Sequence, residues 1–133
     1  MSDAGQNKPL IVLVEDDQIL AQMYLRKFEL EGFDVRHAMD GEAGLDLIKQ
    51  VKPRLVLMDI MMPKRNGLET LKLLREDPEV GQTFVAMLTN VGEQQYVDEG
   101  TKLGANEYLM KSALTPHEVA DKVKGWLAEL DKK

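Results

Sequence analysis

The sequence predicts an α/β fold in which a five-stranded parallel sheet is covered by helices on both faces. Three short apolar runs are typical of buried parallel strands, because none of them alternates with polar residues: Leu10–Val14, Leu55–Met58 and Phe84–Leu88. Two weaker strand candidates are Phe33–His37 and Asn106–Met110. Helical patterns lie between and after these runs, so the sequence predicts five β-α repeats, each a strand followed by a helix. Strict β-α alternation implies right-handed crossovers and a doubly wound sheet.

Each predicted helix has apolar residues at intervals of three and four, which place them on one face. A weaker helix is expected over about residues 93–103, because its glycines lower its helix propensity. The inward positions, in chain order, are Leu20, Met23, Tyr24 and Phe28; Gly44, Leu47, Ile48 and Val51; Leu68, Leu71 and Leu74; Tyr96, Gly100 and Leu103; and Val119, Val123, Trp126, Leu127 and Leu130.

Residues at the ends of these patterns support the helix boundaries. Asp17 is placed to cap the first helix, where a carboxylate meets free amide donors, and Gly32 suits a left-handed turn at its end. Two capping boxes mark later helix starts: Asn66 with Glu69, and Thr115 with Glu118.

Composition excludes several classes of function. The chain has 133 residues and a formal net charge of −6, which disfavours binding to nucleic acid or to an anionic membrane. It has no cysteine, so disulfides, thiolate metal sites and cysteine nucleophiles are excluded. The first ten residues are polar, and every apolar run is too short to span a bilayer. We therefore expect a cytoplasmic protein without membrane insertion.

Polar residues follow four of the five predicted strands. Carboxylates come after the first and third strands, a hydroxyl ends the fourth and an amine follows the fifth: Glu15 and Asp16, Asp59, Thr89, and Lys111. The second strand ends in Ala38 and adds nothing obvious. Functional sites in parallel sheets lie beyond the carboxyl ends of the strands, so we expect these groups to share one site.

Clustered carboxylates favour a hard divalent cation such as Mg²⁺ or Mn²⁺. Together with a lysine and a hydroxyl, they are the groups needed for phosphoryl transfer to an aspartate, with Asp59 attacking and Lys111 neutralising oxygens. Singly, Asp59 could be an ordinary loop residue and Lys111 a solvated one. His37 and His117 share no ligand cluster, and we interpret them as surface or helix-start residues.

The chain resembles the receiver domain of two-component response regulators over about residues 9–131. Four motifs carry the resemblance: VLVEDD at 12–17, LVLMDIMMPKRNGLE at 55–69, FVAMLTN at 84–90 and GANEYLMK at 104–111. The resemblance implies a flavodoxin-like strand order of 2-1-3-4-5. Residues 1–8 are then expected to be a flexible N-terminal segment, and residues 132–133 a C-terminal tail.

The resemblance also implies roles for single residues. Asp59 is the implied phosphoacceptor, and Mg²⁺, with Mn²⁺ as a possible substitute, would be bound by Asp16, Asp59, the backbone carbonyl of Met61 and, through a water, Glu15. Lys111 and Thr89 would contact the phosphoryl group, and Tyr108 would follow Thr89 inward. The implied partners are a sensor histidine kinase or a histidine phosphotransfer protein, and an unknown downstream protein. Beyond catalysing its own phosphorylation and dephosphorylation, the protein would not be an enzyme.

Three departures from the family pattern affect the expected site. Ser112 stands where the family has proline after a cis peptide bond, which a serine disfavours. Asn90 stands where the family prefers a very small residue, and it is expected to narrow access to Asp59. Met61 and Val91 would flank the hydrolytic water, and because neither can orient it, we expect the phosphorylated form to decay slowly.

Two other classes of function remain as alternatives. A pseudo-receiver would act as an interaction module independent of phosphate. Such a protein would not need Glu15, Asp16 and Asp59 together with Lys111. An aspartyl-phosphate phosphatase needs a second acid two residues after its nucleophile, and that position is Met61. The favoured interpretation is a stand-alone receiver that relays the phosphoryl group or regulates a partner through its fourth helix, fifth strand and fifth helix.

Overall fold

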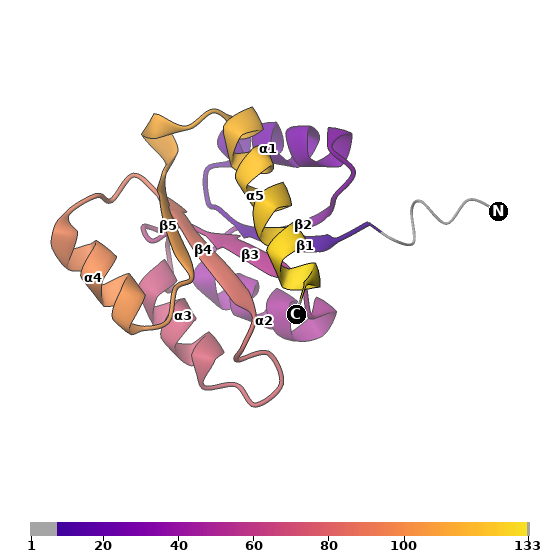
Figure 1. Cartoon of the computed structure of the whole chain (residues 1–133). Helices are drawn as coiled ribbons and strands as arrows, with labels where there is room; N and C mark the ends of the chain where they lie inside the picture. Colours follow the sequence, from indigo (N-terminus) through magenta and orange to yellow (C-terminus); the bar gives the residue numbers. More distant parts are fainter. Residues whose placement is uncertain (1–7, 133) are drawn as a thin grey trace.

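The computed structural model describes residues 8–132 and shows five strands alternating with five helices (Figure 1). A short 3₁₀ helix, η1, lies between β5 and α5. The elements in chain order are β1 (Leu10–Val14), α1 (Gln18–Leu30), β2 (Asp34–Ala38), α2 (Gly41–Val51), β3 (Leu55–Met58), α3 (Gly67–Arg75), β4 (Phe84–Thr89), α4 (Gln94–Lys102), β5 (Glu107–Met110), η1 (Lys111–Ala113) and α5 (Pro116–Asp131). Residues 1–7 of the flexible segment expected at 1–8, and residue 133 of the tail expected at 132–133, lie outside the described residues.

The sheet is parallel throughout and has the strand order β2-β1-β3-β4-β5. This order confirms the predicted doubly wound, flavodoxin-like fold. β1 and β3 are neighbours, with Val14 paired to Met58 at their carboxyl ends. The residues that follow these two strands therefore begin side by side.

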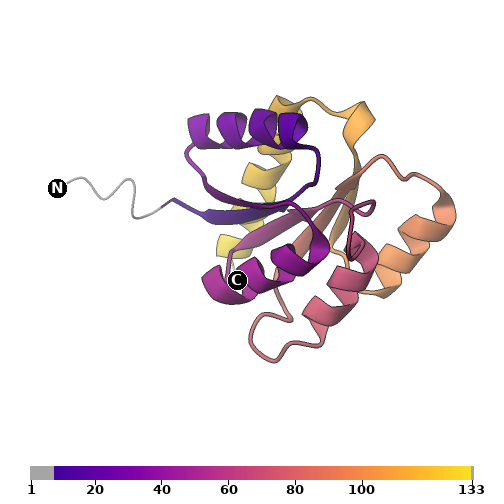
Figure 2. The ribbon, with the colours of Figure 1, turned by 180° about the vertical axis from the view of Figure 1, so that it is seen from behind.

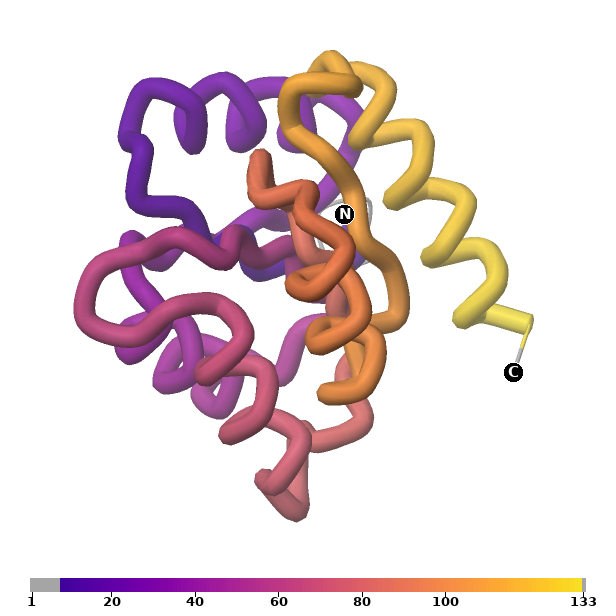
Figure 3. Tube along the Cα trace, turned by 90° about the vertical axis from the view of Figure 1, so that its left-hand side faces the viewer, coloured from indigo at the N-terminus to yellow at the C-terminus, as the bar shows by residue number. Residues whose placement is uncertain are grey.

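Helices cover both faces of the sheet, with α1 and α5 on one face and α2, α3 and α4 on the other (Figures 1 and 2). Successive side chains of a strand point to opposite faces. In β1, Ile11 and Leu13 pack with α1 and α5, whereas Val12 and Val14 pack with α2 and α3. In Figure 3, α4 and α5 lie on opposite sides of β5.

The caps inferred from sequence form as predicted. Asp17 accepts the backbone N–H of Leu20 at 3.0 Å, and both capping boxes, at Asn66 and at Thr115, are complete. Gly32 has a φ of 91°, a left-handed conformation that disfavours other residues. The starts of α1, α3 and α5 are therefore specified by local hydrogen bonds.

Some sequence predictions were wrong in detail. Met23 was expected to face the core but is 51% exposed, because Ala21, Tyr24 and Phe28 form the buried face of α1. β2 begins and ends one residue later than expected, at Asp34 and Ala38, and β4 extends to Thr89. Among residues 8–132, no helix is long and apolar enough to cross a membrane.

Candidate functional site

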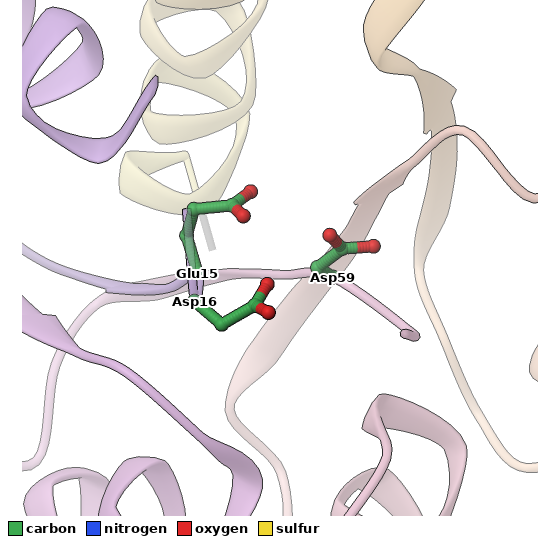
Figure 4. A group of neighbouring side chains, drawn as sticks. All are labelled: Glu15, Asp16 and Asp59. Atoms are coloured by element: carbon green, nitrogen blue, oxygen red, sulfur yellow. The ribbon is translucent and has the colours of Figure 1, made fainter. Parts of the chain in front are cut away.

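Strand alternation explains why three charged groups meet at the carboxyl edge of the sheet. Leu13, Leu57 and Leu109 all pack on the α1/α5 face. Glu15, Asp59 and Lys111 come two residues later in the sequence, just after their strands end, and therefore reach the same face. Figure 4 shows the carboxylates of Glu15 and Asp16 beside that of Asp59, where the chain leaves β1 and β3.

Lys111 joins the two buried carboxylates. Its ammonium nitrogen lies 2.5 Å from Oδ2 of Asp59 and 2.6 Å from Oε1 of Glu15. All three side chains are at most 10% exposed. Because ion pairs are screened little away from water, the electrostatic attraction within this contact is stronger than in a surface salt bridge.

The site changes the proton affinity of its members. Burial raises the pKa of Glu15 above its ordinary value, although hydrogen bonds from Lys111 and from the Asp17 amide act in the opposite direction. Burial alone would lower the pKa of Lys111, but its hydrogen bonds to Asp59 and Glu15 outweigh this effect and raise it. Lys111 is therefore charged at neutral pH.

The backbone around Asp59 fixes its carboxylate. Oδ1 accepts the backbone N–H of Ile60 at 2.7 Å, which leaves Oδ2 for Lys111. The following loop folds back so closely that a Cβ atom on Gly67 would lie 2.0 Å from the Asp59 carbonyl oxygen. Only glycine is compatible with this approach, so Gly67 is needed for the orientation of Asp59.

Three carboxylates at this edge could hold a metal ion. Glu15, Asp16 and Asp59 each offer an oxygen atom, and these atoms lie within 4.8 Å of one another. Both oxygens of Glu15 already have partners, namely Lys111 and the Asp17 amide at 3.0 Å. Asp16 is the most exposed of the three and is therefore the most accessible to a hydrated cation. An all-oxygen donor set of this kind fits Mg²⁺ or Mn²⁺. Met61, predicted to contribute its carbonyl, follows two residues after Asp59 and has an exposed side chain.

Thr89 and Tyr108 lie on the other face of the sheet, toward α4. Thr89 is fully buried, and its hydroxyl accepts the backbone N–H of Val91 at 3.2 Å. The Tyr108 hydroxyl donates to the Val91 carbonyl, and its ring packs in the core cluster that includes Leu68. An ideal Cβ on Gly100 of α4 would lie 3.7 Å from the Tyr108 ring, so the ring packs close against the backbone of this helix. The two residues are thus linked through Val91.

Two of the residues that depart from the family pattern, Asn90 and Ser112, contact one another. The side-chain oxygen of Asn90 accepts the backbone N–H of Ser112 at 2.9 Å. No peptide bond among residues 8–132 is cis, so the Lys111–Ser112 bond is trans. The sequence offered no sign of the contact, because the two loops are 22 residues apart.

His37 was wrongly interpreted as a surface or helix-start residue. It lies at the end of β2, is half-buried, and its Nε2 donates a hydrogen bond to the Glu15 carbonyl oxygen at 2.7 Å. The Ala38 carbonyl also accepts the Glu15 backbone N–H at 3.0 Å. The second strand therefore supports the backbone of an acidic residue in the site. His117 is exposed at the start of α5, as expected.

The fold and the arrangement of these side chains define a doubly wound α/β protein with an acidic site and a buried lysine at the carboxyl edge of its sheet. The sequence matches the response regulator receiver domain family over residues 11–124. The chain belongs to this family and is thus part of the two-component signalling systems in which receiver domains act.

Known proteins agree with this assignment. The transcriptional regulatory protein CpxR of Escherichia coli (strain K12) is 46% identical over 101 residues, which cover 76% of this chain and 42% of CpxR. The chain therefore spans less than half the length of that relative. A Francisella response regulator receiver domain has a TM-score of 0.79 at 32% identity, covering 88% of this chain and 94% of that one. A CheY-like receiver domain protein from Methanospirillum hungatei JF-1 has a TM-score of 0.87 at 26% identity, covering 95% and 98%.

Proposed function

We propose that this protein is a signalling switch that accepts a phosphoryl group on Asp59 in a Mg²⁺-dependent reaction. The observation that carries the proposal is the Lys111 ammonium group held between Asp59 and Glu15, next to Asp16, at the carboxyl edge of the sheet. This arrangement supplies a nucleophile, a fixed positive charge and a set of oxygen ligands in one place.

In the proposed reaction an oxygen of Asp59 attacks the phosphorus of the donor. A new P–O bond forms to Asp59, while the bond from phosphorus to the donor breaks and its electron pair leaves with the donor. The donor is a phosphohistidine of a kinase or phosphotransfer protein, whose imidazole leaves, or a small acyl phosphate, whose carboxylate leaves. The ammonium group of Lys111 turns toward the oxygens of the transferred phosphoryl group. Asp16, Asp59, the Met61 carbonyl and, through a water, Glu15 would hold Mg²⁺, which neutralises charge on the phosphoryl group when bound.

The switch itself depends on Thr89 and Tyr108. A phosphoryl group adds acceptor oxygens to which the Thr89 hydroxyl could donate, and rotation of the hydroxyl toward one of them would alter the hydrogen bond that it accepts from the Val91 amide. Tyr108 contacts the same residue through the Val91 carbonyl, so it would move with the loop. Because the Tyr108 ring packs near Gly100, this movement would change the face formed by α4, β5 and α5.

A downstream protein would bind that face, and transfer of the phosphoryl group to another protein is the other possible output. CpxR is, by its name, a transcriptional regulatory protein, but the segment that matches this chain covers only 42% of its length. The phosphate-independent pseudo-receiver is the competing function, and Asp59 accepting no phosphoryl group would favour it.

Beryllofluoride, a stable phosphoryl mimic, tests the switch. With Mg²⁺ present, we expect its addition to shift the amide NMR signals of Thr89, Tyr108 and α4 in the wild type. The Asp59→Asn variant should show no such shift, because the mimic bonds to a carboxylate oxygen. Asp46→Asn, the same change at an exposed position of α2, should behave as the wild type. Mg²⁺ binding without any beryllofluoride response in α4 and β5 would indicate a pseudo-receiver.

We also expect the phosphorylated form to be long-lived, with a half-life of minutes or longer. The side chains of Met61 and Val91 are apolar and cannot orient a water for attack on phosphorus. The decay of the adduct after removal of the donor measures this half-life. Met61→Asn, which introduces a group that can bind a water, should shorten it several-fold. Decay of the wild type within seconds would contradict the expectation.

A further inference from the structure

Asn90 connects the loop after β4 to the turn that carries Lys111. Its side-chain oxygen accepts the backbone N–H of Ser112 at 2.9 Å. Asn90 directly follows Thr89, and Ser112 directly follows Lys111. One hydrogen bond therefore joins the neighbours of two residues that the proposed function places at the phosphoryl group.

The backbone N–H groups at the start of η1, the turn that donates this hydrogen bond, need hydrogen-bond acceptors outside the turn. η1 has only three residues, and the first N–H groups of a 3₁₀ helix have no carbonyl partner inside it. Met110, which precedes η1, provides no side-chain cap. Asn90 therefore caps η1 from a different loop, 22 residues away in sequence.

The loop that holds Asn90 is itself fixed to β5. Tyr108 donates a hydrogen bond to the Val91 carbonyl, and an ideal Cβ at Gly92 would lie 3.0 Å from the Met110 side chain. Asn90 thus extends from a loop with two further contacts to the strand that leads into η1. A cap held in this way can fix the backbone of a turn more firmly than a side chain on a free loop.

We propose that Asn90 is a positioning residue, which caps η1 and thereby holds the Lys111 ammonium group between Glu15 and Asp59. A lysine side chain has many rotamers, so a fixed backbone limits the positions that its charge can occupy and supports its contacts with the two carboxylates. The inference rests on the proposed function of Asp59, because the benefit of a fixed Lys111 is faster phosphoryl transfer.

Three variants test this role. Asn90→Ala removes the acceptor oxygen, whereas Asn90→Asp keeps one in the same place. Gln95→Ala, at an exposed position near the start of α4, is the matched control. For each protein we would measure amide hydrogen exchange at Ser112, the dissociation constant for Mg²⁺, and the rate of phosphorylation at saturating acetyl phosphate.

We expect Asn90→Ala to speed exchange of the Ser112 amide by about threefold to tenfold, the range that corresponds to loss of one hydrogen bond. Phosphorylation should slow by about the same factor, while Mg²⁺ binds no more weakly than in the wild type. Asn90→Asp should restore both values toward those of the wild type, and Gln95→Ala should change neither. A variant that is merely less folded would also bind Mg²⁺ more weakly, so Mg²⁺ affinity separates positioning from stability.

Unchanged Ser112 exchange in Asn90→Ala, or faster exchange with phosphorylation at the wild-type rate, would overturn the role of Asn90. Absence of phosphorylation in the wild type would instead show that the proposed function is wrong. In that case the NMR signal of the Lys111 ammonium group still decides whether Asn90 holds this side chain. A signal equally well resolved in the wild type and in Asn90→Ala would refute the inference.

Discussion

Replacing Lys111 with methionine is expected to lower the free energy of unfolding by about 2–4 kcal/mol near neutral pH in metal-free buffer. The change removes the only cation that contacts Glu15 and Asp59 among the described residues, and both carboxylates are less than a tenth exposed. Methionine has a similar length and retains most of the packing of the lysine chain. The loss therefore reports the cost of leaving two buried carboxylates without a cation.

The deficit should depend on pH. Burial raises the pKa of Glu15, and hydrogen bonding by Lys111 limits this rise. Without Lys111 the pKa rises further, so the folded state binds protons more tightly than the unfolded state. A carboxyl of this kind destabilises the fold when it is ionised. The deficit of the variant should thus be small below the ordinary glutamate value of 4.5, grow as the pH rises above it, and level off once Glu15 is ionised in the folded state as well.

Urea unfolding of both proteins at several pH values measures this deficit. Lys122→Met provides the control, since Lys122 is exposed on α5, and it should alter stability by no more than about 0.5 kcal/mol. Mg²⁺ should recover part of the stability of Lys111→Met by binding the vacated carboxylates. Equal stability of Lys111→Met and Lys122→Met at neutral pH would show that Lys111 is not held in the acidic pocket.

The acidic site could be predicted from the sequence because strand ends bring its members together. In a parallel sheet the residue after each strand reaches one edge, so Glu15, Asp59 and Lys111 were expected at the same edge once the strands were identified. The alternation of side chains along each strand then explains why these three residues lie on the same face of the sheet. Neither argument needs the detailed path of a loop.

Contacts between loops could not be predicted in this way. The Asn90–Ser112 hydrogen bond and the bond from His37 to the Glu15 carbonyl depend on the path of chain segments beyond the strands. The residue pattern is also ambiguous where more than one helix face is apolar. Met23 has the spacing of a core residue, but it lies beside the buried Tyr24 on the exposed side of α1. Tertiary packing decided between faces that the pattern could not distinguish.

Asp59→Asn is expected to abolish phosphorylation. An amide oxygen is a far weaker nucleophile than a carboxylate oxygen, and the other two acids of the cluster are less suited to attack. Glu15 is only 1% exposed, and Asp16 lacks the contact with Lys111 that Asp59 makes. Asparagine has nearly the shape of aspartate, so the fold should be retained, and Asp46→Asn controls for the loss of one negative charge.

The most direct measurement is the intact mass of the protein after incubation with acetyl phosphate, with and without Mg²⁺. We predict a single phosphoryl group on the wild type and on Asp46→Asn, dependent on Mg²⁺, and none on Asp59→Asn. A phosphoryl group on Asp59→Asn at the wild-type level would show that Asp59 is not the acceptor. No phosphoryl group on the wild type, at a Mg²⁺ concentration that saturates the site, would contradict the proposed switch.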